Sequence, residues 1–448
     1  MIDQSSHLAQ NLRDVRRLCR LGALEPDQLP AYWVDTDAAR DPHCSLRHSI
    51  KAKLEDEESD LQLLVYGHGG SGKSTELVKL VEELGPTFFT VRFSVQEELN
   101  FADIIPQDIL LVLVEQVLQK AQDAQLTVSE KTLDAVYRWF AKETSTLTEG
   151  KQSELDIHAE AGVGNSLLIP FVKFMTSLKS DIKLNTRRET SRVQEIRKRP
   201  GELISNVNLL LSAVRLALPR GHRLLIIVED MDKLDIASAR RVFIENVNLL
   251  TGIVATIIYT IPIFTFHSPE AGILRNKFGD CISLPMIKVL ESDGSPAGGY
   301  DKVREIVRRR IPETILTEAA LKLLIEKTGG VLQHVFEVLH TAASMSDAVE
   351  PLSEANIRYG LQRKRREFFS EITIPYGGVP GEEVKVQNLY DRLVEYARVQ
   401  LDGGKNPPRS DAVNQLLLKC CALVEYNGEG WFGVHPLVID NLREQALL

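Results

Sequence analysis

One short segment limits what this chain can fold into more than any other feature. Residues 67–74, GHGGSGKS, fit the phosphate-binding loop pattern G-x-x-x-x-G-K-[ST] without a mismatch. The pattern belongs between a buried strand and a helix, and the chain has an apolar run at 61–66 and a helix-like stretch at 75–84. A chance glycine-rich turn would fit on the order of a few per cent of chains this long, and the flanking elements lower that chance. The sequence therefore predicts a nucleotide-binding α/β core.

Each residue type in the loop has a role in binding a nucleotide. Glycines lack Cβ, so the backbone can take positive φ and turn its N–H groups inward, while the following helix start adds partial positive charge. Lys73 can reach the β- and γ-phosphates, the Ser74 hydroxyl can ligate Mg²⁺, and Thr75 can donate near the α-phosphate. The residues expected to bind the nucleotide are Gly67, His68, Gly69, Gly70, Ser71, Gly72, Lys73, Ser74 and Thr75.

A second constellation follows the apolar run 224–228, a strand expected to be buried on both faces. The run leads directly into Glu229, Asp230 and Asp232, at the edge of a sheet where ligands bind in open α/β folds. We expect Glu229 to serve the metal and Asp230 to position or deprotonate water. The usual order is Asp and then Glu, so this chain reverses it. A register with Asp230 on the metal and Asp232 as the base is the alternative, and a solvated turn after the strand is another.

Phosphoryl transfer also needs a polar contact to the γ-phosphate and a compensating cation. Thr260, after the strand expected at 254–259, is the candidate for the contact; a plain strand-end threonine before Pro262 is the alternative. Arg275, just before the last expected strand, is the candidate for an arginine finger that points into a neighbouring subunit. An exposed helical arginine is the alternative for Arg275.

The order of elements predicts several domains. Strands at 61–66, 87–93, 224–228, 254–259 and 281–284, with helices between them, predict a doubly wound P-loop core. The expected units are an N-terminal segment at 1–45, the core at 46–290 with a helical insertion at about 127–200, a helical lid at 300–355, and a winged-helix-like domain at 385–448. The last of these rests on two helices followed by two short strands around an Asn427-Gly428 turn.

Composition narrows the class of protein. The 448 residues are 44% hydrophobic, but no apolar run approaches the roughly 18 residues of a membrane span, and the N-terminus is polar. The 5 cysteines form no C-x-x-C pair, which suits a reducing cytoplasm; Cys281 and Cys420 are expected in the core. A net charge of −9 argues against a protein that coats nucleic acid through overall charge. Two basic clusters, at 302–310 and 363–366, are either binding surfaces or solvated helix faces.

Together these motifs resemble the bacterial AAA+/STAND-type ATPases related to origin-recognition initiators. The resemblance rests on 67–77, on Val228 to Leu234, on Tyr259 to Pro262 and on Thr328 to Leu332, and it covers roughly residues 30–448. It implies a P-loop core, a helical lid, a winged helix and ATP as the nucleotide. The 32–35 stretch is similar to the segment that packs beside the base pocket in such proteins.

One departure from the family concerns the lid. Relatives often carry a sensor arginine after the glycine pair, where this chain has Gln333 and His334. Arg187, Arg188 and Arg192 in the insertion have no role that the resemblance supplies.

The expected function is an Mg²⁺-dependent ATPase that acts as a conformational or assembly switch, in signalling or defence. One alternative is a DNA-binding initiator or loader that uses the winged helix and the 363–366 cluster. Another is a nucleotide-binding scaffold that hydrolyses little, which the reversed order of Glu229 and Asp230 allows. Expected partners are further copies of the chain or another protein, with DNA as an option and no membrane.

Overall fold

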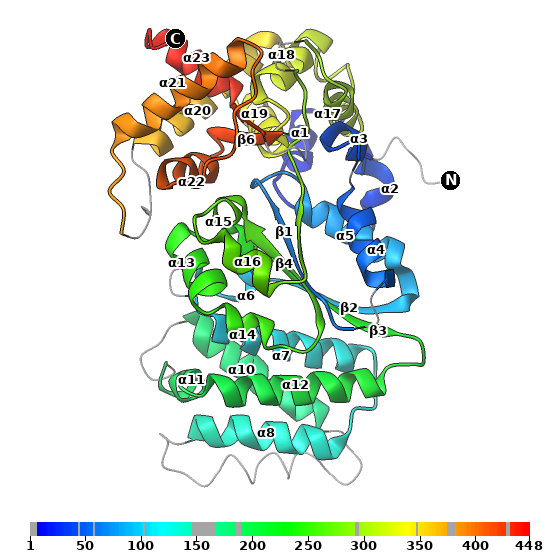
Figure 1. The fold of residues 1–448 in the computed structure, drawn as a ribbon. Helices are drawn as coiled ribbons and strands as arrows, with labels where there is room; N and C mark the ends of the chain where they lie inside the picture. The colour runs from blue at the N-terminus through cyan, green and yellow to red at the C-terminus, as the bar shows by residue number, and fades with distance from the viewer. Residues whose placement is uncertain are drawn as a thin grey trace.

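The core of the chain is a parallel β-sheet. The computed structural model describes residues 7–43, 45–56, 59–101, 104–145, 167–184, 190–291, 295–345, 348–373, 381–426 and 431–448. The strands are β1 (Gln62–Gly67), β2 (Phe88–Ser94), β3 (Arg223–Glu229), β4 (Thr256–Pro262) and β5 (Asp280–Ser283). They lie in the order β2-β3-β4-β1-β5, so β4 separates the strand before the loop from the strand that ends in carboxylates (Figure 1). The predicted α/β class with a P-loop core is confirmed.

Apolar side chains on both faces of the sheet explain why β3 and β4 are buried along almost their whole length. One face packs against α4 (Leu46–Asp56) and α5 (Lys73–Leu84). Val65, Ile227 and Ile258 point to this face from three neighbouring strands. Side chains alternate along a strand, so residues two positions later on these strands point to the same face. At the carboxyl ends of the strands, that face meets the start of α5.

The opposite face joins the largest apolar cluster, which continues into a layer of helices below the sheet (Figure 1). These helices are α7 (Pro106–Asp123), α8 (Glu130–Ser145), α10 (Leu168–Leu184), α11 (Thr190–Arg197) and α12 (Pro200–Ala217). In the segment predicted as an insertion, α8, α10 and α11 pack on each other and on α7 and α12. Arg187 and Arg188 lie outside the described residues, as does the side chain of Arg192.

Short elements complete the core. They are η2 (Gly85–Thr87), α6 (Val95–Glu98), η4 (Met231–Lys233), α13 (Ile236–Arg240), η5 (Arg241–Glu245), α14 (Val247–Thr251), α15 (Ile263–Phe266) and α16 (Ala271–Lys277). The N-terminal segment forms α1 (Leu12–Leu18), α2 (Leu29–Tyr32) and α3 (Asp37–Arg40). It contacts the region predicted as the lid, where Arg16 donates to the carbonyl of Ala343 at 2.6 Å.

Two further groups of helices lie above the carboxyl edge of the sheet (Figure 1). The predicted lid region holds α17 (Gly299–Arg308), α18 (Glu318–Thr328), α19 (Leu332–Ala343) and the long α20 (Glu354–Thr373). We call residues 381–448 the C-terminal region; it holds α21 (Val386–Leu401), α22 (Ala412–Lys419), β6 (Leu423–Tyr426), β7 (Trp431–Val434) and α23 (Pro436–Glu444). Strands β6 and β7 pair antiparallel. The predicted Asn427-Gly428 turn lies outside the described residues. The domain limits and the winged-helix assignment stay predictions.

Several details differ from the sequence-based predictions. Strand β4 runs from Thr256 to Pro262, so Thr260 lies inside the strand and not after it. Helices α20 and α23 were not predicted. Cys281 and Cys420 are only half-buried, whereas Cys19 and Cys421 are buried.

The basic cluster at 302–310 is not a free cationic face. Arg304 and Arg308 both pair with Glu318. Arg310 is buried, and its guanidinium lies 4.7 Å from the centre of the Tyr32 ring. In the part of the chain that the structure describes, no helix combines the length and the apolar character that a membrane span requires.

Candidate nucleotide-binding site

The glycine-rich loop connects β1 to α5 and is already curled. Gly70 and Gly72 have φ of 72° and 100°, values that L side chains rarely adopt. Gly72 is the N-cap of α5, and no side chain caps this helix start within the described residues. The first N–H groups of α5 are therefore directed at the loop, as an anion-binding cradle requires.

Lys73 lies at the centre of the cradle. Its side chain is buried, and its Nζ donates to the carbonyl oxygens of Gly67 at 3.0 Å and His68 at 2.8 Å. The Asp232 carboxylate lies 2.7 Å from the same Nζ. An ammonium has three N–H groups, so the two carbonyls aim the lysine while an anion satisfies its third donor. In this structure that anion is the Asp232 carboxylate.

Glu229 is the carboxylate that the sequence assigns to the metal, and this role stays a prediction. It ends β3, is only 3% exposed and is hydrogen-bonded to the side chain of Ser74. Nε of Arg92, on β2, donates to Oε1 of Glu229. Burial raises the pKa of the Glu229 carboxyl, although Arg92 and Ser74 act in the opposite direction.

Asp230 and Asp232 point to different parts of the site. Asp230 has φ of 65°, accepts a hydrogen bond from Ser94 Oγ at 2.5 Å and pairs with Lys233 at 2.7 Å. Its carboxylate is therefore held at the end of β2. The 3₁₀ turn η4 then brings the carboxylate of Asp232 back to Lys73. The structure thus places Glu229 and Asp232 beside the loop residues, with Asp230 one strand further away.

Thr260 is fully buried on β4, and no hydrogen-bond partner of its Oγ1 lies among the described residues. The register pairs Val228 with Tyr259, so Glu229 and Thr260 are neighbours one step further along their strands. Because side chains alternate along a strand, the side chains of Glu229 and Thr260 both point to the face that packs against α5. A buried hydroxyl without a partner is costly, so this position favours a polar ligand group.

Arg275 does not join this cluster. It lies exposed on α16, with its guanidinium 5.1 Å from the centre of the Phe266 ring. Phe266 in turn stacks on Tyr66 at the end of β1, with the ring centres 3.8 Å apart. Arg275 therefore lies near the carboxyl edge of the sheet but on the surface.

Two residues that touch the site, Arg92 and Arg40, were not singled out in the sequence, and a third, Gln333, was named only as the residue that replaces a sensor arginine. Arg92 contacts Glu229. It is a lone cation in the apolar stretch 88–93, so the sequence alone could have marked it as a candidate site residue. Gln333 at the start of α19 packs on the loop so closely that a Cβ on Gly70 would lie 2.3 Å from the Gln333 Cβ. Arg40 is buried, and its Nη2 donates to the Ser71 carbonyl at 2.6 Å. Burial lowers the pKa of Arg40 to about 10.

The N-terminal segment also reaches the start of α5. The backbone N–H of Leu24 donates to Thr75 Oγ1 at 3.2 Å. The Trp33 indole donates to Glu76 Oε1 at 3.3 Å, and Arg47 lies over the same indole at 4.9 Å. The stretch that resembles a base-pocket segment therefore packs against the helix that follows the loop.

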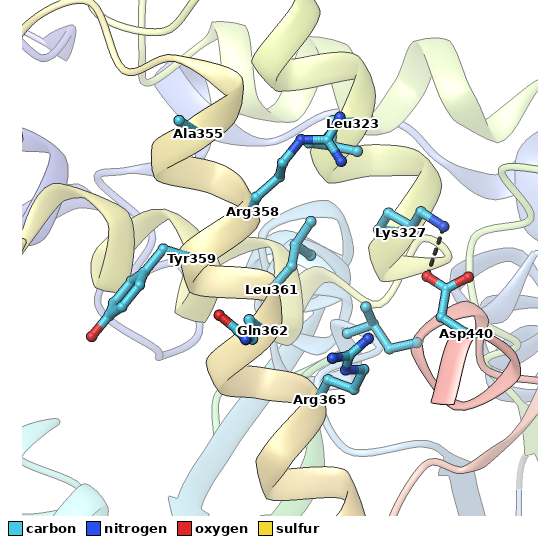
Figure 2. A pocket seen from close by; sticks show the side chains of 10 residues that line it. Leu323, Lys327, Ala355, Arg358, Tyr359, Leu361, Gln362, Arg365 and Asp440 are labelled. Carbon is cyan, nitrogen blue, oxygen red and sulfur yellow. Dashed lines mark hydrogen bonds and ion pairs between the residues drawn. The ribbon is translucent and has the colours of Figure 1, made fainter. Parts of the chain in front are cut away.

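A separate groove lies between α18, α20 and α23 (Figure 2). It has a volume of about 500 Å³ and is lined by Lys327, Arg358 and Arg365 among others. Each of these cations already has a carboxylate partner: Asp440 for Lys327, Glu354 for Arg358 and Glu444 for Arg365. The groove contains none of the loop residues, so it is distinct from the candidate site.

No family model matches the chain, and no curated protein matches it. Solved structures similar to it include a Walker-type ATPase, PABY2304, of Pyrococcus abyssi, with 13% identity, coverage of 95% of this chain and 99% of that chain, and a TM-score of 0.42. The ORC1 protein of Aeropyrum pernix in complex with DNA has 10% identity, coverage of 98% of both chains and a TM-score of 0.39.

The RuvB Holliday junction branch migration motor of Thermotoga maritima has 11% identity, coverage of 88% of this chain and 90% of that chain, and a TM-score of 0.32. At these identities and TM-scores the comparisons carry no argument about what this chain does. The structure itself shows a parallel sheet in which a phosphate-binding loop joins β1 to α5. What this fold does in the chain has to be argued from the residues of its site.

Proposed function

We propose that this chain binds ATP with Mg²⁺ at residues 67–75 and uses the nucleotide to switch its conformation or its assembly. The observation that carries the proposal is the arrangement around Lys73. Two carbonyls aim its ammonium and an anion satisfies its remaining donor. On the adjacent strand lies a buried hydroxyl, that of Thr260, which has no partner among the described residues. A phosphate oxygen can replace the Asp232 carboxylate at Lys73 without a change in the loop.

The residues present fit a magnesium ion. The Ser74 hydroxyl and the Glu229 carboxylate are already hydrogen-bonded to one another, and both are hard oxygen ligands of the kind that Mg²⁺ prefers. When bound, Mg²⁺ would neutralise charge on the phosphates. The chain lacks the Asn-Lys-x-Asp guanine signature, and the family resemblance favours ATP over GTP.

The other groups then have distinct tasks. Lys73 and the N–H groups of the loop hold the phosphates, and Thr260 donates to the γ-phosphate. Asp230 holds the attacking water once its bond to Ser94 is released. Arg275, which is exposed at the carboxyl edge of the sheet, compensates charge in the site of a second copy of the chain.

Nucleotide titration by calorimetry in Mg²⁺ tests the proposal. Lys73→Ala should weaken ATP binding by about 10²-fold or more, because the only side-chain ammonium in the cradle is lost. Lys322→Ala is the matched control, since this lysine is 65% exposed on α18 and belongs to neither the loop nor the carboxylate cluster. Equal affinities for the wild type, Lys73→Ala and Lys322→Ala would refute the assignment. Circular dichroism must show that Lys73→Ala is folded.

A scaffold that hydrolyses little is the second candidate, and one observation favours it. Arg92 holds Glu229, while Ser94 and Lys233 hold Asp230, so both carboxylates have protein partners. Steady-state phosphate release separates the two candidates. Tight ATP binding with no release above the level of Lys73→Ala would establish the scaffold.

Binding of DNA by the C-terminal region and the 363–366 cluster is the third candidate. The structure gives it less support, because Lys364 pairs with Glu337 and Arg365 with Glu444. Binding to duplex DNA that falls steeply with salt would support it.

A further inference from the structure

His68 belongs to the nucleotide-binding loop, but its side chain leaves the loop and enters the C-terminal region. The imidazole is completely buried. Its Nε2 accepts a hydrogen bond of 2.8 Å from the backbone N–H of Glu425 on β6, a residue 357 positions away. The ring is also hydrogen-bonded to the backbone of Leu418, and Cys421 Sγ lies 3.7 Å from its Nδ1.

These contacts suit a neutral imidazole. With Nε2 as the acceptor, Nδ1 carries the proton and faces the Leu418 backbone and Cys421 Sγ. Both partners are backbone groups of the C-terminal region, one at the end of α22 and one on β6. The ring is therefore fixed in position and orientation by the docked C-terminal region.

The main chain of the same residue is hydrogen-bonded to Lys73. The carbonyl of His68 accepts from the Lys73 ammonium at 2.8 Å. One residue thus has its side chain held by the C-terminal region and its carbonyl on the group that binds phosphate. The loop pattern accepts any residue at this position, so a buried imidazole with two partners is more than phosphate binding requires.

We propose that His68 is a positioning residue: docking of β6 fixes the loop through the imidazole, and the His68 carbonyl in turn aims Lys73 at the phosphates. The inference rests on the proposed function. Because coupling between two sites is reciprocal, ATP must strengthen the docking of β6 by the same factor by which docking strengthens ATP binding.

Three variants of the full chain separate positioning from packing. His68→Ala removes both ring contacts. His68→Gln keeps an acceptor at about the reach of Nε2, because the amide oxygen replaces that nitrogen. His340→Ala is the matched control, since this histidine is exposed on the lid helix α19.

The first measurement is ATP affinity by calorimetry in Mg²⁺. We expect His68→Ala to bind about 10-fold more weakly, within the usual range of coupling between sites, and His68→Gln to recover most of that loss. His340→Ala should match the wild type. Affinity of His68→Ala within twofold of the wild type would overturn the inference, and so would a His68→Gln variant as weak as His68→Ala.

The second measurement is hydrogen exchange of the Glu425 amide, which reports the link even without nucleotide. Exchange should be about 10-fold faster in His68→Ala than in the wild type, and ATP should slow it in the wild type but not in His68→Ala. Exchange that is equal in both proteins would overturn the contact itself. If the wild type binds no ATP, the proposed function fails and positioning fails with it, while exchange without nucleotide still decides the contact.

Discussion

Acid is expected to unfold the junction between the loop, the lid and the C-terminal region, because three buried imidazoles there must stay neutral. His68 comes from the loop, His334 from α19, and His435 precedes α23. His334 Nδ1 and His435 Nε2 lie 3.1 Å apart and share one hydrogen bond. Burial lowers the pKa of His68 and of His435 to about 3, and it lowers the pKa of His334 well below its ordinary value.

The size of the effect follows from linkage. In the unfolded chain each ring titrates near about 6.5, so above that pH both states are neutral and these groups add no pH dependence. Below it the unfolded chain takes up protons that the folded chain excludes, and stability is lost until the pH reaches the folded pKa. Each ring then costs about 1.4 kcal/mol per pH unit, so at about pH 5 His68 and His435 alone together cost about 4 kcal/mol, and His334 adds to this. That is a large share of the roughly 5–15 kcal/mol of a typical domain.

Urea unfolding followed by circular dichroism between about pH 7.5 and 5 measures this slope. His435→Gln and His68→Gln should each reduce the slope of the unfolding free energy against pH by the amount that one proton contributes. His340→Gln, at an exposed position, should leave the slope unchanged. The difference between variants isolates the histidines, because buried carboxyls such as Glu229, whose pKa is raised, act in the opposite direction. A slope that is the same in His435→Gln and in the wild type would refute the reasoning.

Other substitutions distinguish binding, turnover and assembly. Gly70→Ala should weaken ATP binding about 10-fold, because the residue has positive φ and the new Cβ would lie 2.3 Å from Gln333. Gly381→Ala is the control in the same calorimetric titration, since Gly381 has a similar φ but open space around it. Equal losses of ATP affinity in the two variants would show that the close contact with Gln333 plays no role. Asp230→Asn should bind ATP but release phosphate on the order of 10²-fold more slowly, and a silent Asp230→Asn beside an inactive Asp232→Asn would move the base to Asp232. In the wild type, phosphate release per subunit should rise with protein concentration, and Arg275→Ala should abolish this rise without changing ATP affinity. Wild-type activity that does not depend on concentration would show that the site works within one chain.

The core could be predicted because its signals are local. A glycine-rich loop between an apolar run and a helix, and a buried run that ends in acids, require only neighbouring residues to be recognised. The structure confirmed the α/β class and placed every predicted strand within two residues at its start. Helix α20 could also have been found, since its buried Ile357, Leu361, Phe368 and Ile372 follow helical spacing.

The contacts around the site could not be predicted in the same way. Local patterns do not tell which strand lies beside which, so the meeting of Arg92 with Glu229 depends on β2 being the neighbour of β3. The contact of His68 with Glu425 joins residues at opposite ends of the chain. Asp232 is the exception, because the acidic run included it as an alternative, and only the short 3₁₀ turn η4 decides that it meets Lys73.

The loop is held from three distant parts of the sequence, and this limits how the protein can diversify. Arg40 reaches it from the N-terminal segment, Gln333 from α19, and the backbone at Leu418 and Glu425 from the C-terminal region. A phosphate-binding loop taken from a different protein would lack these partners, so it could not simply replace residues 67–75. In descendants of this sequence, a change at position 68 should be inherited together with changes at 418–425, and a lineage that loses the C-terminal region should no longer retain a histidine in its loop.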